Sequence, residues 1–276
     1  MKRLIINADD LGFAPGVNRG ILECHRAGSV TSASMMVNTP AFDEAAALAR
    51  DTPTLDVGLH FNLLSGSPLT DVPTLANPRT GQFHSLAELA RRAFAGRVAA
   101  DDVRRECSAQ LQALLHAGIA PTHIDSHRHT HALPGILKPV LQCASDVGVR
   151  FVRRPLDRLV MTDPIASAKM SILHAAWRLA VRGLTRAELR FVDDAPAFRG
   201  IALQGAVDLH SRLMALLDAL PNGTTELMLH PGYDDSILAA QDPYRAERER
   251  EVAVLISAAV QSRLSRGDFE LVNFAS

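Results

Sequence analysis

Aspartate and histidine residues stand at the ends of several short apolar runs in this 276-residue chain. Asp9 and Asp10 follow "RLIINA", His60 ends "LDVGLH", and His230 follows "TELML". A fourth segment, "HIDSHRHTH" over residues 123–131, holds four of the 11 histidines. Carboxylates and imidazoles are ligands of catalytic divalent metals and also the usual general acids and bases. These residue types indicate metal-assisted chemistry, provided that the fold brings them together.

An Asp-Asp pair is by itself no sign of a site, because the chain contains four such pairs. Asp101–Asp102 is expected at a helix N-terminus, where carboxylates meet free N–H groups, and Asp234–Asp235 falls in a polar loop. Only Asp9–Asp10 directly ends an apolar strand, so at least partial burial of one carboxylate is expected there. A buried carboxylate needs a cation or hydrogen bonds to offset its desolvation.

The alternating histidines His127, His129 and His131 would all point to one face if the strand continued through them. We expect instead that the strand ends near Ser126, that one of the three enters the site, and that the others support it. His123 precedes the strand and is expected to be structural. A single histidine at a strand end, such as His60, is more often an ordinary core or loop residue than a functional one.

Short β-like runs alternate with amphipathic helical segments along the whole chain. The expected strands cover residues 3–7, 29–37, 55–61, 122–127, 149–154, 188–192, 225–229 and 269–274. The expected helices cover residues 15–27, 42–50, 85–94, 101–118, 135–148, 163–183, 207–220 and 242 onward. Such alternation predicts a mostly parallel sheet.

The fold class we expect is α/β, as a single (β/α) barrel over residues 1–276, distorted or with about seven strands. An open doubly wound sheet is disfavoured, because no Gly-rich phosphate loop follows the first strand. In α/β barrels the active site lies at the carboxyl ends of the strands, where residues remote in sequence converge. The four blocks described above would then form the walls of one site.

A carboxylate and two neutral imidazoles on separate strands form a facial set with open coordination positions. Such a set suits hydrolytic zinc or the iron of oxygenases. A carboxylate next to the ligand could deprotonate a water molecule at the metal, and His230, across the mouth, could protonate a leaving group. Both the hydrolase and the oxygenase remain open at this point, as does a barrel without catalytic activity.

The composition excludes several classes of protein. The formal net charge of -1 gives no sign of nucleic-acid binding, which usually shows a basic excess. Three scattered cysteines without a CxxC pair indicate neither a disulfide framework nor a thiolate zinc site. The start lacks the long apolar run of a signal peptide, and "VAVLISAAV" is too short to span a bilayer. We therefore expect a cytoplasmic protein.

The blocks "NADDLG", "GLHFNLLSG", "PTHIDSHRHTH" and "ELMLHPG" resemble, in that order, those of the YdjC-like carbohydrate deacetylases, which include chito-oligosaccharide deacetylases. The resemblance covers essentially the whole chain. It implies a (β/α) barrel that removes acetyl groups from N-acetylated sugars with one divalent metal ion, zinc or magnesium foremost. Carried over residue by residue, it implies Asp9 as base, His230 as acid, and Asp10, His60 and His127 as metal ligands.

One departure from the family pattern is visible, because Arg128 separates two histidines that are often consecutive in the third block. Within the family the chain looks most like the branch associated with hopanoid biosynthesis, in part through "YRAERERE", and that likeness implies an N-acetylglucosaminyl hopanoid as substrate. The segment "ERERE" is otherwise interpreted as a solvated helix face. Arg153 and Arg154 at a strand end are candidates for binding substrate or for a surface ion pair.

The partners we expect are an acetylated sugar or glycolipid as substrate and no nucleic acid. The helix over 163–183 is largely apolar apart from one polar face. It is expected to pack on the barrel or a partner subunit, as in a homodimer, or else to meet a lipid substrate or a membrane surface. The loop over 63–83 is long enough for a lid.

Overall fold

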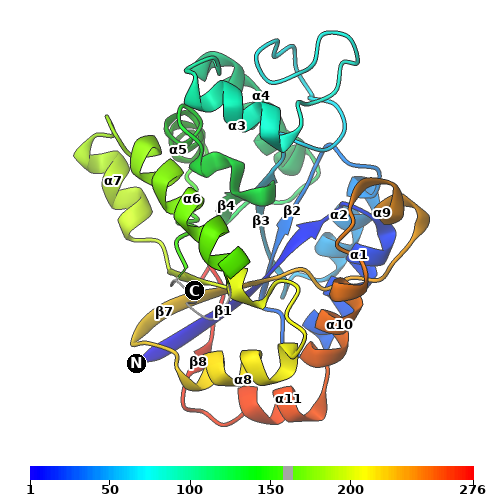
Figure 1. Cartoon of the computed structure of the whole chain (residues 1–276). Coiled ribbons are helices and arrows are strands. Elements are labelled where there is room, and N and C mark those ends of the chain that lie inside the picture. The colour runs from blue at the N-terminus through cyan, green and yellow to red at the C-terminus, as the bar shows by residue number, and fades with distance from the viewer. Residues whose placement is uncertain (158–163) are drawn as a thin grey trace.

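A single parallel sheet forms the centre of the molecule, as seen in a computed structural model that describes residues 1–157 and 164–276 (Figure 1). Its strands are β1 (Lys2–Leu11), β2 (Ser32–Met35), β3 (Asp56–Phe61), β4 (His123–Ser126), β5 (Phe151–Val152), β6 (Ala197–Arg199), β7 (Gly223–Leu229) and β8 (Glu270–Leu271). Their order is β5-β4-β3-β2-β1-β7-β6, and β8 pairs with the first residues of β1. Every pairing is parallel.

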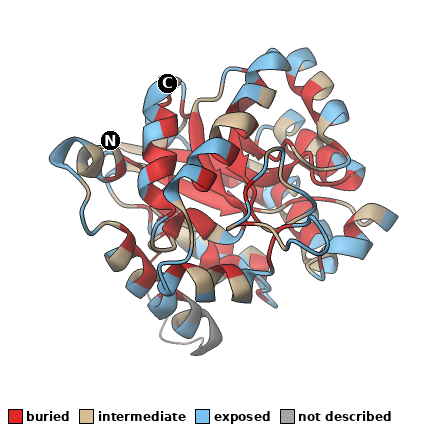
Figure 2. Cartoon of the chain, turned by 90° about the horizontal axis from the view of Figure 1, so that it is seen from above, coloured by how far each residue is buried: buried red, intermediate tan, exposed pale blue. Residues whose placement is uncertain are grey.

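The sheet curls into an incomplete barrel that helices surround. They are α1 (Pro15–Arg26), α2 (Phe42–Asp51), α3 (Leu86–Phe94), α4 (Ala100–His116), α5 (Leu137–Asp146), α6 (Pro164–Ala180), α7 (Arg186–Asp193), α8 (Leu209–Asp218), α9 (Ser236–Gln241), α10 (Ala246–Leu255) and α11 (Ala258–Leu264). Figure 2 shows buried strands in the middle and helices whose outer faces are exposed. Within the described residues no ladder joins β5 to β6, so the barrel stays open there. The predicted distorted (β/α) barrel with about seven strands is confirmed.

Local sequence signals explain where several helices begin and end. Pro15 is the first residue of α1, and Gly28 follows that helix with a φ of +87°. Proline is pre-organised for the first helical position, and glycine adopts positive φ at little cost. Pro139 is the third residue of α5, where the backbone N–H has no intrahelical acceptor in any case, so this proline leaves the helix intact.

The strand predicted over 188–192 is wrong, because this segment lies in α7. The backbone N–H of Glu188 donates to Thr185 Oγ1 at 3.2 Å, and the N–H of Thr185 donates to Glu188 Oε2 at 2.6 Å. This reciprocal pair is a capping box, which satisfies donors at the helix start. The strand at this point of the chain is β6, and the β-propensity of Phe191 and Val192 did not outweigh the cap.

The loop over 63–83 is fastened to α4 by two buried carboxylates. Asp102 Oδ2 accepts from the backbone N–H of Thr74 at 2.9 Å, and Glu106 accepts from the N–H groups of Leu69 and Thr70 at 3.0 Å. Asp102 lies in the first turn of α4 as expected, but its side chain serves this loop. These hydrogen bonds hold the loop against α4, and the expectation of a lid stays a prediction.

Helix α1 packs against the loop after β7 at backbone distance. A Cβ atom added to Gly20 would lie 2.6 Å from the Cα of Gly232, closer than real Cβ contacts come. Gly20 is therefore needed where α1 crosses the "HPG" segment. The ladder between β1 and β7, which pairs Ala8 with Leu229, places His230 near the end of β1. Within the described residues no helix is both long and apolar enough to cross a membrane.

Candidate functional site

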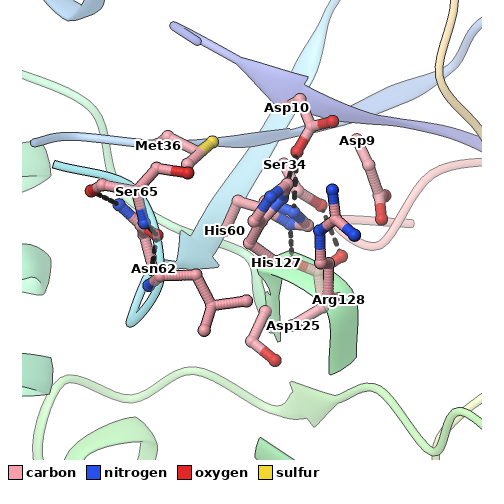
Figure 3. Close-up of polar contacts among 12 residues, drawn as sticks. Asp9, Asp10, Ser34, Met36, His60, Asn62, Ser65, Asp125, His127 and Arg128 are labelled. Carbon is pink, nitrogen blue, oxygen red and sulfur yellow. Dashed lines mark hydrogen bonds and ion pairs between the residues drawn. The ribbon is translucent and has the colours of Figure 1, made fainter. Parts of the chain in front are cut away.

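Three side chains from three different strand ends meet in one buried cluster, Asp10, His60 and His127 (Figure 3). Asp10 Oδ1 lies 2.8 Å from His127 Nδ1 and 3.1 Å from His60 Nε2. Asp10 comes from β1, His60 from β3, and His127 follows β4 directly. The structure thus brings the three expected metal ligands together at the carboxyl ends of parallel strands.

Backbone strain is concentrated at this cluster. Asp10 has a φ of +72°, Arg128 of +53° and His129 of +56°, and no other non-glycine residue among those described has a positive φ. The register of β1 against β2 shifts between Ala8 and Leu11, so the strand bulges where Asp10 turns inward. Such conformations cost about 1–3 kcal/mol each and persist where the surrounding structure enforces them, often at functional sites.

The state of His60 shows that a cation fits the cluster. His60 Nδ1 lies 2.7 Å from Asp125 Oδ1, while its Nε2 is buried without a hydrogen-bond partner among the described residues. Burial lowers the pKa of His60, but the charges of Asp125 and Asp9 and the close carboxylate oxygens of Asp10 and Asp125 raise it to about 10. A positive charge is therefore strongly favoured at Nε2, and a divalent metal ion in place of that proton would meet the same need.

The balance of charges around the site also favours a bound cation. Five buried carboxylates surround two buried guanidinium groups, those of Arg153 and Arg248. The carboxylates belong to Asp9, Asp10, Asp125, Glu226 and Asp242. Burial raises the pKa of Glu226 to about 7, and Arg128 also pairs with Asp242 at 3.5 Å. Even with Glu226 protonated and the imidazoles neutral, the other four carboxylates outnumber the three guanidinium groups, and a divalent cation would offset the excess of negative charge.

A second group of side chains also has metal-ligand spacing, Asp9, His60 and Asp125. Arg153 already fills this position, because its Nη1 lies 2.7 Å from Asp9 Oδ2 and its Nη2 lies 2.5 Å from Asp125 Oδ2. A metal ion there would displace a guanidinium that binds both carboxylates. The candidate metal centre is therefore the cluster of Asp10, His60 and His127.

Hydrogen bonds fix the side chain of Asp9 beside this centre. Both of its oxygens accept from Arg153 at 2.7 Å, and Oδ1 also accepts from Asn7 Nδ2 at 2.9 Å. Arg153 is 3% exposed and also donates from Nε to Glu226 at 2.7 Å. The sequence-based alternatives for Arg153, a substrate ligand or a surface ion pair, are both wrong, because this residue is an internal counter-ion.

Reasoning from the sequence gave Asp125 no role in the site and did not foresee the internal role of Arg153. Asp125 sits on β4 and holds Nδ1 of His60, so it orients a candidate metal ligand. Both stand at or next to strand ends, as the predicted residues do, and that shared position was the available signal. Arg154, by contrast, forms an exposed ion pair with Asp193 at 3.5 Å.

His230 follows β7 and lines the same cavity as Asp9, Asp10 and His127. Its backbone N–H donates to Glu251 of α10, and its ring Nδ1 is buried without a partner among the described residues. Glu251 also accepts from the Tyr244 hydroxyl at 2.6 Å. The ring of His230 is therefore placed by its backbone and remains available to a ligand.

The interpretation of "ERERE" as a solvated helix face is wrong for two of its residues. Arg248 and Glu251, each 1% exposed, point from α10 into the site. Arg248 Nη2 donates to Asp10 Oδ2 at 2.6 Å and to Asp242 Oδ2 at 2.9 Å. Burial lowers the pKa of Arg248, but Asp10 and Asp242 raise it above its usual range, so it stays charged.

The remaining histidines of the 123–131 segment have separate places. His131 is buried, with Nε2 2.8 Å from the carbonyl oxygen of Arg153 and Nδ1 2.5 Å from Ser126 Oγ. His123 stacks on Phe274 with ring centroids 4.0 Å apart, which confirms its structural role. His129 lines the cavity.

The cavity above the cluster has a volume of about 580 Å³ and combines a polar floor with apolar walls. One wall is a face of α3, with Leu86, Ala90 and Phe94 at four-residue spacing. Ile172 and Leu173 of α6 also line the cavity. Leu86 is 39% exposed, Phe94 50% and Ile172 66%, so large apolar side chains face open space beside charged residues.

Fold and site together define an α/β-barrel protein with a candidate metal centre at the carboxyl ends of its strands. A family model described as YdjC-like protein matches residues 3–266. The chain belongs to this family, as the motif resemblance implied.

The chain is also similar to characterised relatives over nearly its whole length. It is 36% identical to a carbohydrate deacetylase of Geobacillus stearothermophilus, over 98% of this chain and 96% of the relative. It is 31% identical to a chitooligosaccharide deacetylase of Salmonella typhimurium, over 98% and 97%. A solved structure of a proposed cellobiose-phosphate cleavage protein from Enterococcus faecalis V583 superposes with a TM-score of 0.78 at 28% identity, covering 99% and 98% of the two chains.

Proposed function

We propose that this protein is a metal-dependent hydrolase that removes the acetyl group from an N-acetylated sugar. The observation that carries the proposal is the position of Asp9, a carboxylate fixed by Arg153 next to the cluster of Asp10, His60 and His127. Binding alone needs no base beside a metal centre, whereas hydrolysis of an amide does. Relatives named as carbohydrate and chitooligosaccharide deacetylases support the same reaction.

Asp10, His60 and His127 would hold the metal ion. Two imidazoles and a carboxylate favour zinc over magnesium, which prefers oxygen ligands alone. The ion would supply Lewis acidity, polarising the amide carbonyl and lowering the pKa of water. Arg248 occupies Asp10 Oδ2, which leaves Oδ1 as the oxygen directed at both imidazoles.

Asp9 would act as the general base. Its Oδ2 takes one hydrogen bond from Arg153 and keeps capacity to accept a proton from the attacking water. Arg153 also holds the carboxylate in one orientation, and such positioning contributes strongly to proton transfer. His230, which lines the cavity, would donate a proton from its ring to the departing amine nitrogen.

The apolar walls of the cavity narrow the substrate to a sugar that carries an apolar group. A free oligosaccharide would leave Leu86, Phe94 and Ile172 in contact with polar hydroxyls or water. An apolar aglycone would bury these side chains, at a gain of about 25 cal/mol per Å² of apolar area. A glycolipid such as an N-acetylglucosaminyl hopanoid therefore fits better, and peripheral membrane contact would follow from such a substrate.

The experiment is acetate release by zinc- or magnesium-loaded protein from two probes, diacetylchitobiose and octyl N-acetyl-β-glucosaminide. We expect release from both, with the higher kcat/KM for the octyl glycoside. Tight binding of either probe without acetate release would instead support a carbohydrate-binding barrel. Oxygen consumption by iron-loaded protein would support the oxygenase, which uses the same ligand set.

A further inference from the structure

His129 lies in the cavity of the candidate site but outside the cluster of candidate metal ligands. It lines the same cavity as Asp9, His127 and His230. Its Nδ1 is buried, and its ring forms no hydrogen bond with any residue that the structure describes. A buried polar atom without a partner is uncommon in native proteins, because no hydrogen bond offsets the free energy lost when the atom leaves water. Because the residue as a whole is only partly buried and lines the cavity, its ring can gain a partner from a ligand bound there.

The backbone directs this ring into the cavity at a conformational cost. Arg128 and His129 both adopt the left-handed region, at φ of 53° and 56°, immediately after the candidate ligand His127. Non-glycine residues rarely occupy that region, and two in succession are rarer still. The turn that delivers His127 to the cluster thus also delivers His129 to the space beside it.

Packing holds the ring in one orientation. His129 meets the ring of Phe198 edge to face, with centroids 5.5 Å apart and planes at 86°. Phe198 is 2% exposed and lies 5.3 Å from the guanidinium carbon of Arg153, so it is itself fixed. A side chain ordered before the ligand arrives loses little entropy on binding, which favours recognition.

We propose that His129 is a specificity-determining residue that forms a hydrogen bond with a hydroxyl group of the sugar. The inference rests on the proposed deacetylase function. An imidazole ring offers one donor and one acceptor, and a hydroxyl group can pair with either. The excess of carboxylates around the cavity disfavours an anionic group at this position.

The test compares wild type, His129→Ala, His129→Asn and His129→Gly with octyl N-acetyl-β-glucosaminide and its 3-deoxy, 4-deoxy and 6-deoxy analogues. Glycine removes the ring and relieves the left-handed backbone, while asparagine tolerates that backbone and keeps a donor and an acceptor. His116→Ala, which changes an exposed histidine of α4, is the matched control. Zinc content and binding of the octyl glycoside to Asp9→Asn protein, with and without His129, are measured alongside.

We expect the alanine and glycine variants to raise KM for the octyl glycoside by about 10-fold, the value of one net hydrogen bond. The changes in kcat should stay within about 3-fold, zinc content should be unchanged, and asparagine should restore part of the affinity. Wild type should bind one deoxy analogue about 10-fold more weakly than the parent, and the alanine variant should not distinguish the two.

Two results would overturn the inference alone, given an active wild type. One is an unchanged KM in the alanine and glycine variants. The other is equal discrimination against every deoxy analogue with and without His129. A loss of zinc would also contradict it, because His129 would then serve the metal centre. If wild type released no acetate from any probe, the proposed function would fail and the inference would fail with it.

Discussion

Arg153 grips Asp9 through both ends of its guanidinium group, with Nη1 2.7 Å from Oδ2 and Nη2 2.7 Å from Oδ1. The two residues are 144 positions apart in the chain, at the ends of β1 and β5. This bidentate pair, in which Arg153 is 3% and Asp9 1% exposed, holds the Asp9 side chain in one orientation at the edge of the candidate metal centre. The two neighbouring aspartates have different counter-ions, because Arg153 pairs with Asp9 and Arg248 pairs with Asp10.

Asp9→Asn should keep the metal and lose turnover. The amide cannot accept a proton from water, and general-base catalysis is worth about 100-fold or more. We therefore expect kcat for acetate release to fall by at least about 100-fold, with zinc content unchanged. The measurement is acetate release beside metal analysis of the same preparation. Near-normal turnover would remove Asp9 from the role of base.

Arg153→Met should destabilise the fold by about 3–5 kcal/mol, because it leaves three buried carboxylates without their counter-ion. Arg153→Lys keeps one charge but not the planar fork, and should lose less. Arg154→Met removes only an exposed pair and should stay within about 0.5 kcal/mol of wild type. Urea unfolding followed by circular dichroism gives all three values. Equal stability of the two Met variants would contradict the internal role of Arg153.

Replacing both candidate imidazole ligands should abolish metal retention. After zinc loading and desalting, we expect about one metal ion per wild-type chain and far less in His60→Ala/His127→Ala. His116→Ala/His210→Ala, which changes two histidines outside the cavity, should retain the wild-type amount. Elemental analysis measures the ratio. Equal zinc in the two double variants would show that the ion binds elsewhere.

Changing the apolar wall should affect substrates with an apolar group selectively. Phe94→Ser should raise KM for the octyl glycoside by about 10-fold, since burying such a side chain contributes about 1.5–3 kcal/mol. KM for diacetylchitobiose should change little. Leu115→Ser is the control, because Leu115 is 38% exposed on α4 and does not line the cavity. An equal rise for both substrates would argue against a wall that binds the aglycone.

The fold should lose stability on mild acidification because of His131. Burial lowers the pKa of His131 to about 4, and both ring nitrogens already have partners, Ser126 and the Arg153 carbonyl. The unfolded chain, with a pKa near 6.5, binds this proton more readily. Stability from this residue is therefore complete above about pH 6.5 and lost as pH falls toward 4, by about 3 kcal/mol.

Urea unfolding at a series of pH values measures this loss. His131→Gln, which cannot titrate, should flatten the dependence between pH 6.5 and 4. His116→Gln changes an exposed histidine and should leave it as in wild type. If His131→Gln and wild type show the same slope, the acid sensitivity has another origin.

The sequence by itself determined the strand-helix alternation, the barrel and the presence of polar residues at strand ends, because these depend on local patterns. The choice of His127 among the three alternating histidines, and the roles of the five candidate residues, came from the family resemblance. An apolar run that ends in Asp9–Asp10 or His60 predicts a strand and a polar group at its carboxyl end. Proline at position 15 and glycine at position 28 mark a helix without any knowledge of its neighbours. The capping box at Thr185 was equally local, and overlooking it produced the one wrong strand.

Only the tertiary structure decided which charged residues face the site. Arg153 belongs to the Arg153–Arg154 pair and Arg248 to the charged segment "ERERE", and both patterns are typical of exposed residues. Both arginines are nevertheless buried against the two aspartates of β1. Whether an arginine is solvated or enclosed depends on carboxylates supplied by distant strands, and no local pattern contains that information. Only the tertiary structure likewise shows that apolar residues of α3 and α6, two helices far apart in the sequence, line the same cavity.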